Sequence, residues 1–171
     1  KIQAVTLPLS MLAVDYYFRR PLKLNLLTEK CLYFGLSLFF GAMGVLLLGK
    51  EGSLEDVANF SLLDRLFIGA YSYVIYLLKF IFPYPLSTLY PYPATLPWYF
   101  YLSPLPIAAL FFGLFKAYQK DYRSVVFAFA FFTFNVMFLL QIVGAGQGFL
   151  ADRFTYIPYI GLFFLLAHAH Q

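Results

Sequence analysis

The chain has 171 residues, of which 62% are hydrophobic, 22% are aromatic and only 12% are charged. A water-soluble domain of this size carries about twice that charged fraction, so the composition excludes an ordinary soluble protein. The net charge is +4, but the Lys and Arg residues do not form a continuous basic face with interleaved aromatic residues. This pattern excludes a nucleic-acid partner. We therefore expect an all-α protein that is embedded in a membrane.

The ends of the chain predict that it is a piece of a longer protein. Lys1 is not preceded by Met and already lies in an apolar run, and another apolar run lies close to the last residue. We expect residues 1–171 to form a single transmembrane module, truncated at both ends. The lone Cys31 lies at the start of an apolar helix, which predicts a small buried side chain rather than a disulfide.

The first two apolar segments have the properties of membrane-crossing helices. Residues 5–14 are apolar and lead into Asp15 and a basic loop over residues 19–30. The next segment, residues 32–48, has a length of roughly 20 residues, which suits a bilayer crossing.

Three later segments bring the expected total to about five spans in a polytopic transmembrane helix bundle. Two of them cover residues 98–115 and 125–143, and the last begins near Pro158. Asn135 and Gln141 lie inside an apolar span, which predicts hydrogen bonds from each to a neighbouring helix.

Two capping-box patterns follow the second span. Ser53 with Asp56, and Ser61 with Asp64, have the required spacing, so a helix is expected to start after each serine. The second of these helices covers residues 62–82.

Helix 62–82 carries one narrow polar stripe on an otherwise apolar surface. Steps of three and four residues return to the same helix face and connect Arg65, Gly69, Ser72, Tyr76 and Lys79. Such a helix either lies in the membrane interface or turns its stripe into a bundle. We expect an interfacial or re-entrant helix whose cations reach the interface, with lipid-headgroup binding as the alternative.

Residues 83–97 contain five prolines, which exclude a regular helix. The aromatic residues of this segment and of the position after it suit the headgroup level of a membrane. These aromatic residues are Tyr84, Tyr90, Tyr92 and Trp98. Their side chains either anchor the chain at the headgroup level or stack on a sugar ring.

The distribution of Lys and Arg predicts the orientation. The basic loops 19–30 and 116–123 are both expected on the cytoplasmic side, but a crossing by every apolar helix places them on opposite sides. The conflict disappears if helix 62–82 does not cross. Segments 50–97 and 144–157 are then both extracytoplasmic. The alternative is a full crossing by this helix against the charge bias.

The adjacent Asp152 and Arg153 form the strongest candidate site, because charge beside a membrane is costly. Arg153 presents a planar fork that matches phosphate oxygens, so it is a candidate ligand for a lipid-linked phosphate. Asp152 is a candidate for orienting Arg153, binding a metal or accepting a proton. The structural alternative is an ion pair that fixes the helix start before Pro158. No His or Cys spacing typical of a metal site is present.

Three short motifs occur in the order that one known family shows. They are Lys1-Ile-Gln-Ala-Val-Thr6, Leu86-Ser-Thr-Leu-Tyr-Pro-Tyr-Pro93 and Ala151-Asp-Arg-Phe-Thr-Tyr-Ile-Pro-Tyr-Ile-Gly161. With them the chain resembles bacterial relatives of the transmembrane-and-tetratricopeptide-repeat proteins, which are GT-C class glycosyltransferases akin to protein O-mannosyltransferases. It departs from the family pattern where Ile2, Asp152 and Tyr159 replace the more usual Glu, Glu and Ser.

The resemblance implies a membrane enzyme that moves a sugar from a polyprenyl-phosphate carrier to a protein or glycan acceptor. The transfer takes place on the extracytoplasmic side of the bacterial inner membrane. The family's acidic catalytic residues precede Lys1 and its repeat domain follows the last span, so the chain alone is expected to be inactive. The resemblance implies no cofactor other than the lipid-linked sugar donor itself. The partners that it implies are this donor, the membrane lipid and the acceptor.

The resemblance also implies the site residues. Arg153 is the expected phosphate ligand and Asp152 supports it, while Tyr156, Tyr90 and Tyr92 are the other expected substrate-binding residues. The alternative function is a non-enzymatic polytopic membrane protein that binds or transports a lipid-linked anion. A purely structural membrane module is a third possibility.

Overall fold

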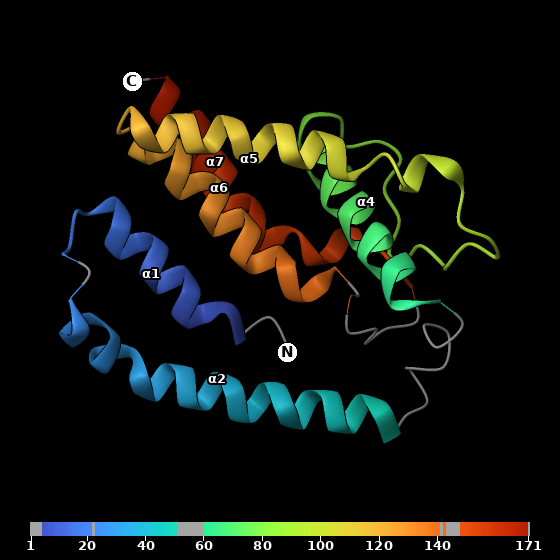
Figure 1. The fold of residues 1–171 in the computed structure, drawn as a ribbon, viewed down its shortest axis with the longest axis horizontal. Helices are drawn as coiled ribbons and strands as arrows, with labels where there is room; N and C mark the ends of the chain where they lie inside the picture. The colour runs from blue at the N-terminus through green and yellow to red at the C-terminus, as the bar shows by residue number, and fades with distance from the viewer. Residues whose placement is uncertain (1–4, 22, 51–59, 141, 143–147, 171) are drawn as a thin grey trace.

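The computed structural model describes residues 5–21, 23–50, 60–140, 142 and 148–170 (Figure 1). The predicted all-α class is confirmed, since no β-strand forms within these ranges. The helices are α1 (Leu7–Tyr17), α2 (Leu24–Lys50), α4 (Leu62–Ile81), α5 (Pro104–Gln119), α6 (Arg123–Val136) and α7 (Tyr156–Ala169). Short 3-10 turns lie at η2 (Trp98–Phe100), η3 (Met137–Leu139) and η4 (Asp152–Phe154).

Two helices in the described ranges are long and apolar enough to cross a membrane. They cover Leu24–Leu47 and Trp98–Gln119, with 24 and 22 residues. The helices at Arg123–Leu139 and Tyr156–Ala169 are also apolar but shorter. These helices are consistent with the expected membrane character, while the number of about five spans remains a prediction.

Helix α6 lies between its neighbours in the bundle, with α1 on one side and α5 and α7 on the other (Figure 1). Gly161 permits the close approach of α7. A Cβ atom at this position would lie 2.7 Å from the carbonyl oxygen of Ala128 and 3.1 Å from the side chain of Phe131. The absence of a side chain at Gly161 therefore sets the spacing between α6 and α7.

A buried polar side chain joins α6 to α1, as predicted for Asn135. Thr6 donates a hydrogen bond to Asn135 Oδ1 at 2.7 Å, and Asn135 Nδ2 donates to Ser10 Oγ at 2.8 Å. Such bonds hold helices together where no water is available to compete for the amide. Gln141, the other residue expected to bond in this way, lies outside the described residues.

Local sequence signals predict the helix ends unevenly. The capping box of Ser61 and Asp64 is confirmed, since the Asp64 amide donates to Ser61 Oγ at 3.2 Å and the Ser61 amide donates back to the carboxylate. The pattern at Ser53 and Asp56 falls outside the described residues. Helix α6 ends at Val136 and continues only as a 3-10 turn, so it is shorter than the predicted span.

Helix α2 lies at the edge of the molecule, where α1 is its main neighbour in the described part of the chain (Figure 1). Most of its apolar side chains are exposed, including Leu38 at 77%. The expectation of a buried Cys31 is wrong, because this thiol lies on the exposed surface of α2. An exposed surface of this composition is suited to contact with lipid rather than with water.

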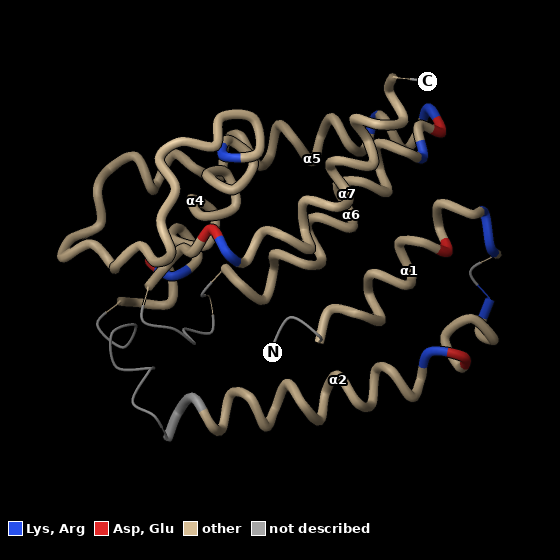
Figure 2. Tube along the Cα trace, turned by 180° about the vertical axis from the view of Figure 1, so that it is seen from behind, with Lys and Arg blue, Asp and Glu red and all other residues tan. Residues whose placement is uncertain are grey.

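The two basic loops lie together at one end of the molecule (Figure 2). Arg19 of the first loop forms an ion pair with Asp121 of the second at 2.9 Å. Arg123 Nη1 also donates to the carbonyl oxygen of Tyr16 at 2.9 Å. Helix α4 and the Pro/Tyr segment 83–97 lie at the other end (Figures 1 and 2), and the ion pair with Lys79 of α4 holds Asp152 there. Both loops are therefore in position to face the same compartment.

Candidate functional site

The site begins where the Pro/Tyr segment meets the segment that holds Asp152. The Tyr90 amide donates to the carbonyl oxygen of Leu150 at 2.9 Å, and the Phe149 amide donates to that of Tyr90 at 3.0 Å. Gly148 permits this contact, because a Cβ atom there would collide with the carbonyl oxygen of Tyr90. Two segments about which the sequence predicts only a shared compartment are thus in direct contact.

The polar stripe of α4 faces this junction. Ser72 Oγ donates to the carbonyl oxygen of Phe149 at 3.2 Å. The Ala151 amide donates to the hydroxyl of Tyr76 at 3.1 Å, and Tyr76 is fully buried. From Ser72 to Lys79 the stripe therefore points into the bundle, so the expectation that Lys79 reaches the membrane interface is wrong. Polar side chains on one helix satisfy the backbone groups of a segment that has no regular structure of its own.

Asp152 is held by three different groups. Its carboxylate accepts hydrogen bonds from Lys79 Nζ at 2.8 and 2.9 Å, from the Ser87 amide at 2.6 Å and from the Tyr90 hydroxyl at 3.0 Å. Lys79 also donates to the Tyr90 hydroxyl. The Lys79 and Asp152 side chains are only 10% and 15% exposed. Asp152 therefore pairs with Lys79 of α4 rather than with its neighbour Arg153.

Arg153 extends from η4 into an exposed position. Its guanidinium lies 5.3 Å from the ring centroid of Phe154, and among the described residues it forms no ion pair. The planar fork of an arginine offers five N–H donors, which match the oxygens of a phosphate or carboxylate. Arg153 is therefore available to an anionic ligand in a way that Lys79 is not.

A cavity of about 540 Å³ lies between α4, the Pro/Tyr segment and the start of α7. Its charged lining consists of Lys79, Asp152 and Arg153, which sum to one net positive charge. Much of the remaining lining is apolar or aromatic and includes Phe80, Leu86, Tyr156, Tyr159 and Phe163. A volume of this size is within the range of small-molecule sites, about 300–1,000 Å³. The lining suits an anionic group attached to an apolar chain.

The structure brings together some of the predicted site residues and separates others. Asp152, Arg153 and Tyr156 line the cavity, and the Tyr156 side chain is 77% exposed. Tyr90 contacts the site indirectly, through its hydrogen bond to Asp152. Tyr92 is not among the lining residues, because its ring packs against Phe149, with 6.2 Å between the ring centroids.

Lys79 belongs to the candidate site, although the sequence patterns do not assign it there. The sequence places it on the polar stripe of α4 but assigns it a contact with the membrane interface. The relevant signal is that Ser72 and Tyr76 share the face of Lys79, and a helix face with three such groups generally needs a polar partner. The Ser87 amide was also missed, since a backbone donor leaves no mark in the sequence.

No protein-family model, curated protein or solved structure matches this chain. Within the described ranges, no three His, Cys, Asp or Glu side chains gather in a way that would hold a metal ion. The candidate site is therefore assigned from its geometry, and the family resemblance remains a prediction.

Proposed function

We propose that the chain is part of a GT-C-type membrane glycosyltransferase that transfers a sugar from a polyprenyl-phosphate carrier. The acceptor is a protein or a glycan on the extracytoplasmic side of the bacterial inner membrane. The observation that carries this proposal is the cavity beside Arg153, which combines net positive charge with apolar walls. A polyprenyl phosphate has the complementary pattern of an anionic head on a hydrocarbon chain.

The chemistry assigned to the chain is stabilisation of the phosphate leaving group. As the sugar is transferred, negative charge grows on the phosphate, and a cation held at that position favours the transition state. Arg153 supplies the donors. The Lys79–Asp152 pair fixes the backbone on which Arg153 is carried, since Asp152 is the preceding residue. The carboxylate that deprotonates the acceptor is expected upstream of this chain.

The proposed membrane arrangement is a polytopic bundle in which α4 does not cross. The contact between the two basic loops through Arg19 and Asp121 supports it, because positively charged loops favour the cytoplasmic side. Segments 50–97 and 144–157 are then extracytoplasmic, and the cavity faces the outer leaflet.

Cysteine labelling tests this topology. In a Cys31→Ser background, Thr88→Cys is expected to react with a membrane-impermeant maleimide in intact cells. Lys120→Cys, in the second basic loop, is the matched reporter and is expected to react only after lysis. Both positions are exposed, so access is decided by the membrane alone. If α4 crosses, the pattern is reversed: Thr88→Cys then reacts only after lysis, and Lys120→Cys reacts in intact cells.

The phosphate role of Arg153 is tested in the full-length protein with Arg153→Lys. This substitution keeps the charge but removes the bidentate fork, and sugar transfer is expected to fall about ten-fold. Arg153→Ala is expected to reduce transfer by at least as much. Transfer from the lipid carrier is measured at matched protein levels, and unchanged rates in both variants would refute the assignment.

A second candidate function is binding or transport of a lipid-linked anion without catalysis. It is favoured by the state of Asp152, the only carboxylate that lines the cavity within the described residues, which is already paired with Lys79. The two functions differ in one measurement. That measurement is the amount of sugar transferred from the lipid carrier to an acceptor. A binding or transport protein binds polyprenyl phosphate but transfers no sugar, whereas a transferase consumes the sugar-loaded carrier.

A further inference from the structure

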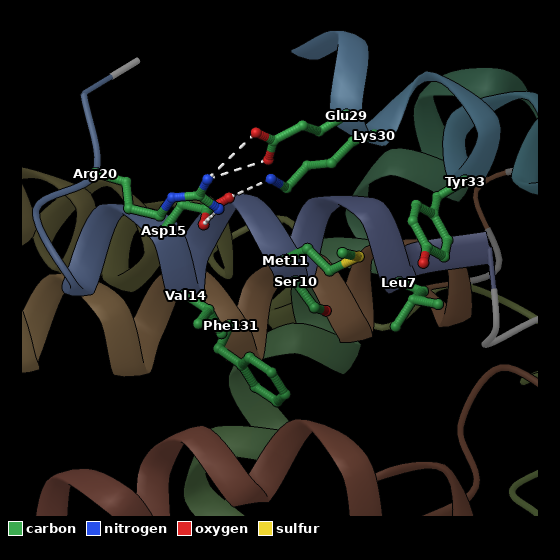
Figure 3. Close-up of a pocket in the computed structure, with 10 residues that line it drawn as sticks. All are labelled: Leu7, Ser10, Met11, Val14, Asp15, Arg20, Glu29, Lys30, Tyr33 and Phe131. Atoms are coloured by element: carbon green, nitrogen blue, oxygen red, sulfur yellow. Dashed lines mark hydrogen bonds and ion pairs between the residues drawn. The ribbon is translucent and has the colours of Figure 1, made fainter. Parts of the chain in front are cut away.

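A second cavity, of about 480 Å³, lies between α1 and α2 at the end of the molecule that holds the basic loops (Figure 3). Four charged side chains gather at one end of it: Asp15, Arg20, Glu29 and Lys30. This end of the molecule is opposite to the Arg153 cavity, and none of the lining residues is shared. The second cavity therefore needs an explanation of its own.

The four charges divide into a buried pair and an accessible pair. Lys30 and Asp15 are 2.5 Å apart and their side chains are only 3% and 8% exposed. Burial raises the pKa of Asp15, but hydrogen bonds from Lys30 and Arg20 outweigh burial and hold this pKa below its ordinary value. Arg20 contacts Glu29 at 3.1 Å, and these side chains are 49% and 53% exposed. Only Arg20 and Glu29 are therefore within reach of a ligand.

Most of the rest of the lining is apolar or aromatic, and among the described residues Ser10 is the one small polar residue in it. Figure 3 shows Met11, Leu7 and the ring of Tyr33 along the groove beyond the charges, with Val14 and Phe131 on the side of α6. The outer surface of α2 next to this groove is apolar and exposed. A ligand that fills the cavity must be charged at one end and apolar along the remainder, which is the pattern of a membrane lipid.

We propose that this groove binds a phospholipid whose headgroup carries both a phosphate and a primary ammonium, as in phosphatidylethanolamine. Two positive and two negative side chains give the cluster no net charge. A purely anionic headgroup must compete with Asp15 and Glu29 for Arg20. A zwitterionic headgroup places its phosphate on Arg20 and its ammonium on Glu29, so both exposed charges keep a partner. The proposal does not depend on sugar transfer.

The first test uses the unmodified full-length protein. It is purified in a mild detergent, delipidated and titrated with phosphatidylethanolamine, phosphatidylglycerol or phosphatidylcholine, and bound lipid is counted by native mass spectrometry. Phosphatidylethanolamine is expected to bind about ten-fold more tightly than either competitor, which is the effect of one charge-assisted hydrogen bond. Phosphatidylcholine has no N–H donor for Glu29. Equal or tighter binding of phosphatidylglycerol would overturn the proposal.

The second test assigns the lipid to this groove. Glu29→Gln is expected to weaken binding of phosphatidylethanolamine and to strengthen binding of phosphatidylglycerol, because Arg20 loses its competing carboxylate, so the preference for phosphatidylethanolamine is lost. Met11→Trp fills the groove and is expected to weaken binding of both lipids about ten-fold. Leu38→Trp, on the exposed face of α2, is the matched control and is expected to change neither. If Met11→Trp and Leu38→Trp behave alike, the lipid binds elsewhere. Sugar transfer is not measured, so failure here leaves the test of Arg153 intact.

Discussion

Asp152→Asn is expected to lower the free energy of unfolding by about 3–5 kcal/mol, the usual cost of removing one partner from a buried ion pair. Lys79 is only 10% exposed, so it would remain charged with little water to replace the carboxylate. The Ser87 amide N–H now donates to the carboxylate at 2.6 Å. In the variant it would either meet the NH₂ group of the Asn side chain or lose its acceptor. Thermal or denaturant unfolding of the purified full-length protein in detergent measures the loss.

A matched control separates burial from charge. Asp121→Asn breaks two ion pairs, with Arg19 at 2.9 Å and with Arg123 at 2.7 Å, but the Arg19, Asp121 and Arg123 side chains are 70%, 53% and 28% exposed. Exposed pairs contribute about 0–1 kcal/mol, so this variant is expected to be close to wild type. The double variant Lys79→Met with Asp152→Asn should recover part of the stability, because the buried cation is also removed. Equal losses in the two Asp→Asn variants would contradict a buried pair at Asp152.

Gly161→Ala is expected to destabilise the protein by about 1–3 kcal/mol through overpacking. The added methyl group would lie 2.7 Å from the carbonyl oxygen of Ala128. This contact is with backbone in the middle of α6, so a side-chain rotation cannot relieve it. Helix α7 must instead move away from α6, which weakens the interface that supports the start of α7 and the cavity beside it. The same unfolding measurement reports the change.

Gly113→Ala is the matched control for this substitution. Gly113 also lies in the middle of an apolar helix, but a Cβ atom there has no neighbour within 4 Å. Both variants gain the higher helix propensity of Ala, which is worth about 1 kcal/mol in water. The difference between them therefore isolates the contact with α6. A Gly161→Ala protein as stable as the Gly113→Ala protein would show that the two helices are not tightly packed.

Features that depend on neighbours in sequence could be predicted, and the capping box of Ser61 and Asp64 is the clearest example. Both partners lie within one helical turn, so the spacing alone specifies the contact. The ion pair of Lys79 and Asp152 could not be predicted in this way. Its partners lie 73 positions apart, and only the packing of α4 against the other segments brings them together. The helix face of Lys79 was predictable, but its partner was not.

The expectations for Asn135 and Cys31 have opposite outcomes. Asn135 was predicted to bond with another helix because an amide in an apolar span must find a partner, and it does so with Thr6 and Ser10. Cys31 was expected to be buried because thiols usually are. That rule describes proteins surrounded by water, and it fails for a side chain on the apolar outer surface of α2.

The separation of Lys79 from Asp152 also has a consequence during biosynthesis. At roughly 5–20 residues per second, the ribosome adds Asp152 about 4–15 s after Lys79. During this interval α4 has already been made, but its cation has no carboxylate to accompany it into the bundle. Burial of Lys79 against its partner is therefore possible only after Asp152 has been made. The Arg153 cavity, which both residues line, therefore forms only after the segment that contains Asp152 has been made.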